Sequence, residues 1–234
     1  RGLISARPRS GYFVRDQAQR PLHEPQQRSR EAQTSEVDVS ELVFSVLASL
    51  KDPHTVPFGS AFPSPALFPL PRLARCMSKS LRAMPAHAVI ADMTEGNPDL
   101  RRQIALRYLN SGVLLAPQEL VISNGAMEAL NLCLQCVTQP GDLVAIEGPA
   151  FYATLQVLER RNVKAGEIPG HPREGIDLEA LSNSLGHRPI SAWWRMSNRQ
   201  NPHGASMSEA KERDLDSLLG QHQLPLIEDE VYVE

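Results

Sequence analysis

Aromatic side chains and cysteines are scarce in this sequence, and neither sign of charge dominates. Aromatics make up 5% of the 234 residues, there are three cysteines, and the formal net charge is −3. Three cysteines do not build the disulfide framework of a small secreted domain, so we expect a protein of the reducing cytoplasm. A chain this close to neutrality is no polycation, and any contact with nucleic acid must come from a local patch. No apolar run approaches the roughly 18 residues of a membrane span, so no membrane partner is expected.

The remaining composition is typical of a soluble globular protein. Hydrophobic residues make up 41% and charged residues 22% of the chain, whose length suits one large domain or a domain with an appendage. The sequence begins at Arg1 rather than Met and stops at Glu234, directly after an apolar run. We therefore expect the chain to be a fragment of a longer protein that is truncated at both ends.

Two of the cysteines, Cys133 and Cys136, form a C-x-x-C. They lie in the apolar run of residues 129–137, which indicates a buried helix. A zinc site needs a second pair of ligands at suitable spacing, and none is present. The motif therefore favours helix packing over metal or redox chemistry, and no metal site is predicted.

The first 37 residues contain a hairpin pattern and a linker pattern. Residues 3–6 and 12–14 are β-prone and flank Arg7-Pro8-Arg9-Ser10-Gly11, whose proline and glycine suit a turn. Arg7, Arg9 and Gly11 at this tip suit contact with DNA phosphates or the minor groove, and a solvated edge hairpin is the alternative. Residues 16–37 have almost no apolar side chains and predict a flexible tether.

Two amphipathic helices are predicted after the tether. The first has an apolar stripe that begins after Asp38, and Pro53 ends it. The second covers residues 70–84. The proline-rich residues 58–65 between the two indicate an extended segment.

A third helix has a well-marked start and stop. Asn97 can cap it, Pro98 fits its first turn, and Asp99 suits the positive end of the helix dipole. The segment Asn110-Ser111-Gly112 ends it. Its predicted buried face consists of Ile104, Ala105 and Tyr108.

Strand and helix patterns alternate from residue 120 onward. The predicted strands are residues 120–123, 143–147, 163–168, 191–196 and 224–228. The predicted helices are residues 125–137, 151–161, 178–185 and 208–221. This repetition predicts an α/β fold with a mainly parallel sheet and flanking helices.

Polar and aromatic residues collect where these strands end, which is where open α/β sheets bind ligands. The backbone N–H groups of Gly125, Ala126 and Met127 start a helix and suit an anion such as a phosphate, although a plain helix start explains them as well. Phe151 could stack on a planar ring or pack in the core. Asn201, Asp229 and Tyr232 could grip a polar aromatic ring, because a carboxylate pairs with a ring nitrogen while an amide and a phenol bind a ring hydroxyl. Strand-end capping is the alternative for Asp229.

These four features, in this order, resemble the fold-type-I pyridoxal-phosphate proteins of the aspartate aminotransferase family. The resemblance covers residues 58–234. The stretch from Gly2 to Val14, with Gly-Leu-Ile-x-Ala-Arg-Pro-x-Ser-Gly-Tyr-Phe-Val, is similar to the wing of the winged helix-turn-helix in GntR regulators. Together they resemble the MocR-like subgroup, in which a winged helix is joined to an aminotransferase-like domain.

The resemblance implies a domain plan and a partner set. Residues 1–15 would be the remnant wing, 16–37 the linker, and 38–234 an incomplete class I/II aminotransferase-like domain. The whole protein would be a transcriptional regulator that binds DNA and pyridoxal 5′-phosphate, responds to an amino acid or amine effector, and forms a homodimer.

The resemblance also implies roles for the candidate site residues. Gly125, Ala126 and Met127 would cradle the cofactor phosphate, and Phe151 would stack on the pyridine ring. Asn201 and Tyr232 would bind the oxygen of its 3-hydroxyl group, and Asp229 would pair with the pyridinium nitrogen. Arg7, Arg9 and Gly11 would belong to the DNA-binding wing.

The sequence departs from the family in ways that limit these expectations. The Schiff-base lysine and the arginine that holds a substrate carboxylate are not present, and Lys211 lies on a polar helix face, so no catalytic residue is assigned. Arg199 stands where relatives often carry an aromatic. The sheet would lack its middle strands, which leaves exposed edges. We expect noncovalent cofactor binding at best and no transaminase turnover from this chain.

Two other readings stay open. The chain could be a fragment of a genuine class I/II aminotransferase acting on an amino acid, with residues 1–37 an unrelated leader. It could also be a nonfunctional remnant, or a scaffold that only dimerises.

Overall fold

The computed structural model describes residues 4–8, 10–14, 34–35, 43–44, 47–48, 54, 56, 61–91 and 94–232. At the start of the chain, β1 (Ile4–Arg7) pairs antiparallel with β2 (Gly11–Val14). The predicted hairpin is therefore confirmed. Gly11 has a φ of +95°, a conformation that residues with a Cβ rarely adopt, so the turn needs glycine here.

The predicted linker is partly wrong. Within it, β3 (Thr34–Ser35) pairs antiparallel with β5 (Lys164–His171), so two of its residues extend the main sheet. Backbone pairing of this kind needs no apolar side chain, which is why composition gave no sign of it. The rest of the range 16–37 lies outside the described residues.

Several helical segments lie between β3 and α5 (Ala126–Val137) in the described chain. They include η1 (Pro65–Leu67), α2 (Leu70–Ala83), α3 (Ala88–Ala91) and α4 (Pro98–Asn110). Of the helix predicted from Asp38, the structure describes Val43, Phe44, Leu47 and Ala48, all helical, and its other residues lie outside the described ones. Residues 58–60 of the predicted extended segment also lie outside them.

The start of α4 is the one that the sequence predicts. Asn97 caps it, since its Oδ1 accepts a hydrogen bond of 3.0 Å from Leu100 N. The predicted buried face is wrong at Tyr108, which is 39% exposed, whereas Ala105 is buried. Apolar spacing identifies a face of the helix, but neighbouring elements decide how much of that face is covered.

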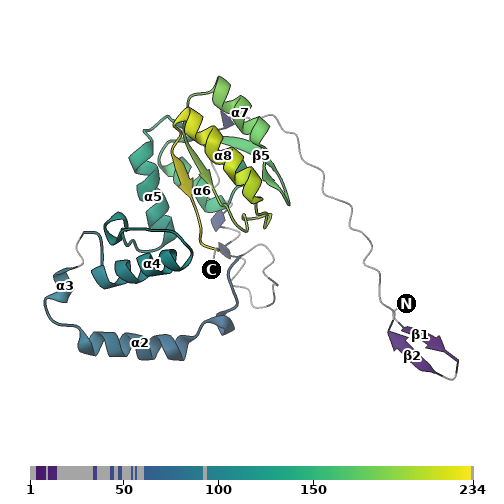
Figure 1. Cartoon of the computed structure of the whole chain (residues 1–234), viewed down its shortest axis with the longest axis horizontal. Helices are drawn as coiled ribbons and strands as arrows, with labels where there is room; N and C mark the ends of the chain where they lie inside the picture. Colours follow the sequence, from purple (N-terminus) through teal and green to yellow (C-terminus); the bar gives the residue numbers. More distant parts are fainter. Residues whose placement is uncertain are drawn as a thin grey trace.

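The main sheet is largely parallel, as predicted (Figure 1). Its order is β3-β5-β4-β7-β8, where β4 is Leu143–Gly148, β7 is Ile190–Arg195 and β8 is Leu226–Glu228. The pairs β4–β5, β4–β7 and β7–β8 are parallel, and β6 (Gly175–Ile176) pairs antiparallel with β5. The helices between the strands are α5 (Ala126–Val137), α6 (Tyr152–Arg160), α7 (Leu178–His187) and α8 (Glu209–His222).

Strand alternation divides the core into two layers, one on each face of the sheet. Trp194 points to the α5 and α6 face, whereas its neighbour Trp193 points to the α7 and α8 face. The first layer also holds Leu130, Leu134, Val144, Ile146, Val157, Leu158 and Ile227. The second holds Ala145, Ile168, Ile176, Leu181, Leu215 and Leu219. This arrangement fixes the ends of β4, β7 and β8 side by side.

The strand predicted at residues 120–123 is wrong. The segment follows η2 (Pro117–Glu119) and is not part of the sheet. Its Ile122 N–H donates to the Glu95 carbonyl at 2.9 Å, and a Cβ on Gly96 would lie 2.5 Å from the Ile122 Cβ. The segment therefore packs against the loop before α4, because no strand of the described chain lies beside it.

The buried helix predicted around the C-x-x-C is also partly wrong. Helix α5 buries Leu130 and Leu134, but Cys133 and Cys136 are exposed. Residues 129–137 are apolar on most sides, yet only one face of α5 has the sheet to pack against. Apolar composition alone does not reveal which side of a helix is covered.

Candidate functional site

The ends of β4, β7 and β8 meet at one edge of the sheet, and four of the ten predicted site residues follow these strands. Asp229 directly follows β8, Phe151 is the N-cap of α6 after β4, and Asn201 lies in the loop after β7. Because parallel strands all end at the same edge, the sheet brings together residues that are 78 positions apart, from Phe151 to Asp229.

Asp229 is a buried carboxylate at this edge. It is 7% exposed, and its backbone N–H donates to the Arg195 carbonyl at 2.9 Å, one residue beyond the β7–β8 pairing. Burial raises the pKa of Asp229, and a hydrogen bond of 3.2 Å from Val231 N to its Oδ1 opposes that rise. A carboxylate held in this way is suited to accept a hydrogen bond from a nitrogen that carries a proton, because that bond would compensate for the hydration that the carboxylate loses on burial.

Phe151 and Asn201 line one small cavity. Its volume is about 20 Å³, enough for a water molecule but not for an aromatic ring. The lining consists of Ile146, Glu147, Ala150, Phe151, Thr154, Trp194, Arg195, Met196, Gln200 and Asn201. The Phe151 ring also contacts Tyr152, with ring centroids 4.5 Å apart.

Gln200 ties the two loops of this cavity together. It is 7% exposed, and its Nε2 donates to the Pro149 carbonyl at 2.7 Å. Its Oε1 accepts a hydrogen bond of 2.9 Å from His203 N. The loop that carries Asn201 is thus fixed to the loop that carries Phe151.

Tyr232 is joined to the same region through its main chain. The Arg199 guanidinium donates a hydrogen bond to the Tyr232 carbonyl. Arg199 itself has a φ of +50°, and its N–H donates to Ser206 Oγ at 3.1 Å. Arg199, where the family pattern favours an aromatic, therefore connects the Asn201 loop to the residues after β8.

The predicted phosphate cradle lies at the start of α5. Gly125 is the N-cap with a φ of +99°, and nothing lies within 4 Å of where its Cβ would be. The N–H groups of Ala126 and Met127 open the helix and are not used inside it. Beside them, Glu128 accepts hydrogen bonds from Asn124 N and Nδ2. Helix α5 contacts β8, and its Leu130 belongs to the same core cluster as Ile227 of β8.

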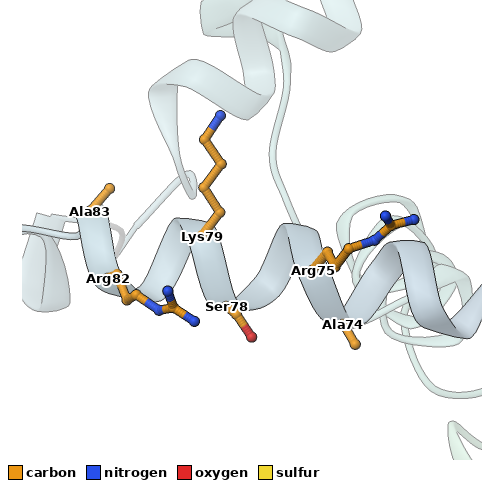
Figure 2. A pocket seen from close by; sticks show the side chains of 6 residues that line it. All are labelled: Ala74, Arg75, Ser78, Lys79, Arg82 and Ala83. Carbon is orange, nitrogen blue, oxygen red and sulfur yellow. The ribbon is translucent and has the colours of Figure 1, made fainter.

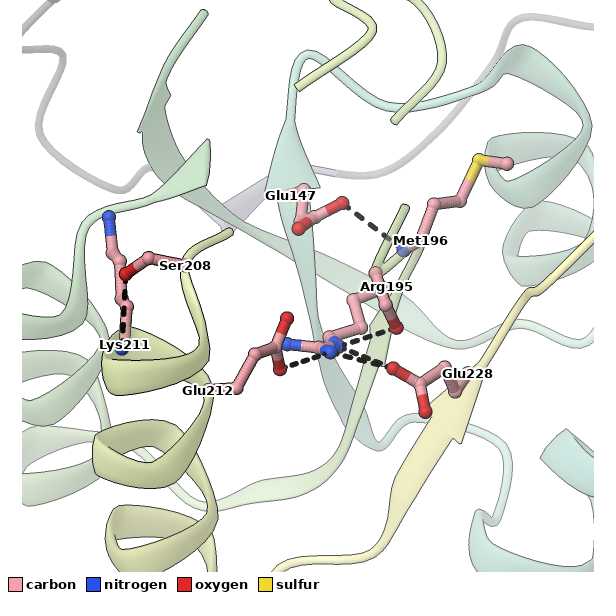
Figure 3. Close-up of polar contacts among 8 residues, drawn as sticks. Glu147, Arg195, Met196, Ser208, Lys211, Glu212 and Glu228 are labelled. Atoms are coloured by element: carbon pink, nitrogen blue, oxygen red, sulfur yellow. Dashed lines mark hydrogen bonds and ion pairs between the residues drawn. The ribbon is translucent and has the colours of Figure 1, made fainter. Parts of the chain in front are cut away.

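A charge cluster around the buried Arg195, which the sequence did not predict, links β7 to α8 and β8 (Figure 3). The Arg195 guanidinium, 4% exposed, pairs with Glu212 at 2.6 Å and with Glu228 at 2.7 Å. Nearby, Glu147 Oε2 accepts a hydrogen bond of 3.2 Å from Met196 N. Burial raises the pKa of Glu147 to about 7. The sequence did hold one sign of this cluster, which is the arginine inside the apolar run of β7. A charged side chain in a buried strand needs partners of opposite charge, so its presence there indicates an ion pair.

The predicted DNA-contacting residues are only partly described. Arg7 is exposed, and its guanidinium lies 4.9 Å from the centre of the Phe13 ring. Gly11 begins β2. Arg9 lies outside the described residues.

A shallow groove on α2 lies apart from the predicted site residues. Figure 2 shows its lining of Ala74, Arg75, Ser78, Lys79, Arg82 and Ala83, all from one helix. It brings together three cations but none of the predicted site residues. The described part of the chain holds no cluster of metal-ligating side chains. Among the same residues, no helix combines the length and apolarity needed to span a bilayer.

Comparisons with known proteins give a consistent picture. A family model for aminotransferase class I and II matches residues 69–234. The chain is 44% identical over 233 residues to YdcR of Escherichia coli (strain K12), an uncharacterized HTH-type transcriptional regulator, and covers 49% of it. It is 34% identical to YjiR, a second such regulator of the same strain, and again covers 49%. The chain thus spans about half the length of these relatives, with nearly all of its own residues aligned.

Solved structures of similar fold include several aminotransferases. One is LysN, the α-aminoadipate aminotransferase of Thermus thermophilus, complexed with N-(5′-phosphopyridoxyl)-L-leucine. It matches 74% of this chain and 43% of its own, with a TM-score of 0.66 and 26% identity. An archaeal alanine:glyoxylate aminotransferase matches 82% of this chain and 48% of its own, with a TM-score of 0.71 and 22% identity.

Proposed function

The chain belongs to the aminotransferase class I and II family, and we propose that the edge formed by β4, β7 and β8 binds pyridoxal 5′-phosphate. The observation that carries this proposal is Asp229, a carboxylate that is 7% exposed at the end of β8. When bound, this cofactor supplies a protonated ring that withdraws electrons from an attached amino acid. The chain's own contribution is to hold the ring and its proton.

The donor set at the edge fits such a ring. Asp229 would keep the ring nitrogen protonated, and burial strengthens that pairing because it removes competing water. Phe151 and Asn201 line the same small cavity, and Phe151 would stack on the cofactor ring at the mouth of that cavity. Asn201 and the Tyr232 phenol would bind the ring hydroxyl.

The start of α5 would hold the phosphate. Gly125, with its positive φ, directs the first N–H groups of α5, those of Ala126 and Met127, outward with the positive end of the helix dipole.

The role we favour for the whole protein is that of a MocR-like transcriptional regulator of the GntR family. Its two relatives named above are HTH-type regulators, and the β1–β2 hairpin offers Arg7 to DNA. The aminotransferase-like domain would bind an amino acid or amine effector, and the protein would act in the cytoplasm as a homodimer. Arg9 and Gly11 would join Arg7 at the DNA backbone.

A genuine aminotransferase is the second candidate, because the solved relatives above carry that activity in their names. The chain has four lysines, Lys51, Lys79, Lys164 and Lys211. Lys211 lies on α8, and its ammonium group donates to the Glu174 carbonyl at 2.9 Å. We therefore expect the 234-residue chain to bind the cofactor without covalent attachment and without transaminase turnover.

Calorimetric titration of the chain with pyridoxamine 5′-phosphate tests this proposal. The amine form carries the same ring and phosphate but does not bond covalently to lysine. We expect pyridoxamine 5′-phosphate to bind saturably. Pyridoxamine without the phosphate should bind more weakly, and inorganic phosphate more weakly still. No binding of the phosphate ester would contradict the cofactor site, and turnover of an amino acid by the chain with pyridoxal 5′-phosphate would favour the second candidate.

A further inference from the structure

The Arg195 guanidinium joins three elements, β7, α8 and β8 (Figure 3). Arg195 is the last residue of β7, and its side chain is 4% exposed. Its Nη2 lies 2.6 Å from Glu212 Oε2 on α8, and its Nε and Nη2 lie 2.9 and 2.7 Å from Glu228 Oε1 on β8. The Nε also donates to Ser197 Oγ at 3.1 Å.

Arg195 also holds Asp229 through its main chain. Strand β8 is three residues long and pairs with β7 in a register that sets Glu228 opposite Arg195. The next residue, Asp229, donates its N–H to the Arg195 carbonyl at 2.9 Å. Along the described chain, no strand lies on the other side of β8. The position of Asp229 therefore depends on Arg195 twice, directly and through Glu228.

We propose that Arg195 is a positioning residue that fixes the Asp229 carboxylate for the bound ring. The inference rests on the proposed function, since it concerns the same site. A three-residue strand at an edge has few backbone hydrogen bonds, so the charged pair with Glu228 adds much of what aligns its end. Lysine would not replace this arginine, because a single ammonium does not present Nε and Nη2 to one carboxylate oxygen in a fixed plane.

The burial of Arg195 is better explained by the orientation that it gives to Glu228 and Asp229 than by a contribution to the stability of the fold. Its Nη1 is buried and has no hydrogen-bond partner in the part of the chain that the structure describes. An unpaired buried donor is unfavourable, and a whole buried ion-pair cluster is often replaced by apolar side chains of similar volume at no loss of stability, although removing one partner alone is destabilising. What an apolar residue does not supply is a fixed direction for Glu228 and the residue after it.

The experiment compares the 234-residue chain with its Arg195→Met, Arg195→Lys and Arg213→Met variants. Arg213 is the matched control, since it lies on α8 with its side chain exposed and only a 4.0 Å pair with Glu209. Each protein is titrated with pyridoxamine 5′-phosphate labelled with 15N in the ring. The ring 15N shift reports whether the ring nitrogen carries a proton, the form that pairing with Asp229 would stabilise. We expect Arg195→Met to raise the Kd about tenfold or more, as removal of outer-shell partners does at metal ligands, and to move the shift toward the unprotonated ring. Arg195→Lys should fall between Arg195→Met and wild type, and Arg213→Met should match wild type.

Two further measurements keep the outcomes apart. Circular dichroism shows whether Arg195→Met folds, and if it does not, Glu228→Ala takes its place, because that side chain is part-exposed and its loss breaks the same link. If the wild-type chain binds the cofactor and the folded variants show the same Kd and the same ring 15N shift, the positioning role is overturned and the proposed function stands. Absence of binding to the wild-type chain overturns both.

Discussion

Glu147 Oε2 accepts a hydrogen bond of 3.2 Å from Met196 N, which ties the end of β4 to the residue after β7. Burial raises the pKa of Glu147 to about 7, and the nearby carboxylates of Glu212 and Glu228 add to that rise. The hydrogen bond from Met196 and the charge of Arg195 act in the opposite direction. Near neutral pH this part-buried carboxyl group therefore exists in both its protonated and its ionised form.

This pKa predicts a loss of stability as the pH rises. Below pH 4.5 Glu147 is protonated in both the folded and the unfolded chain, and between pH 4.5 and about 7 only the unfolded chain ionises. The free energy of unfolding should fall by up to about 3 kcal/mol over this window relative to Glu147→Gln. Urea unfolding from pH 4.5 to 8 measures it, with Glu179→Gln on the exposed side of α7 as the control. Parallel pH curves for wild type and Glu147→Gln would refute the prediction.

Gly125→Ala should destabilise the chain by about 1–2 kcal/mol. The cost is conformational, because φ is +99° and nothing lies within 4 Å of the added Cβ. Gly220→Ala is the matched control, since Gly220 lies in α8 with open space around it and should gain about 0.5–1 kcal/mol. Urea unfolding at one pH compares the two, and a neutral Gly125→Ala would argue against the strained helix start.

Gln200→Leu should weaken both folding and cofactor binding. The change removes the hydrogen bonds to the Pro149 carbonyl and the His203 N–H, both on exposed residues, which costs about 0.5–1.5 kcal/mol. Because the Asn201 loop is then free of the Phe151 loop, the Kd for pyridoxamine 5′-phosphate should rise. Gln221→Leu on the exposed side of α8 is the control. Equal stability and Kd in both variants would show that the tie between the loops is unimportant.

Arg7→Ala should reduce DNA binding without changing its sequence preference. Phosphate contacts by a hairpin give weak, salt-dependent affinity, and loss of one contact lowers the slope of log K against log salt by about 0.9. Fluorescence anisotropy with a duplex at several salt concentrations measures the slope, with Arg213→Ala as the control. A slope that stays the same in Arg7→Ala would remove the hairpin from the DNA interface.

The order of elements was predictable because each one is specified locally. Asn97 and Pro98 define the start of α4, and the apolar runs that become β4 and β7 are long enough to be buried on both faces. The gathering of Phe151, Asn201 and Asp229 at one edge follows from the parallel order alone. Their individual roles stay predictions.

What failed depends on neighbours far away in the sequence. Residues 120–123 have the composition of a strand but contact the loop at Glu95 and Gly96 instead. The cluster of Arg195 links residues 17 and 33 positions away, and no spacing rule connects them. Cys133 was expected in the core because apolar composition does not show on which side α5 meets the sheet.

The central claim is that Asp229 holds the ring nitrogen of the cofactor, and a 15N measurement on ring-labelled pyridoxamine 5′-phosphate tests it most directly. The spectrum is recorded with wild type, Asp229→Asn and Asp216→Asn, the last being an exposed acid of α8. We predict a protonated ring with wild type and Asp216→Asn. With Asp229→Asn we predict an unprotonated ring and a Kd about tenfold or more higher, since a hydrogen bond to a charged group contributes about 1.5–3 kcal/mol. The same ring shift and Kd with Asp229→Asn as with wild type would contradict the account.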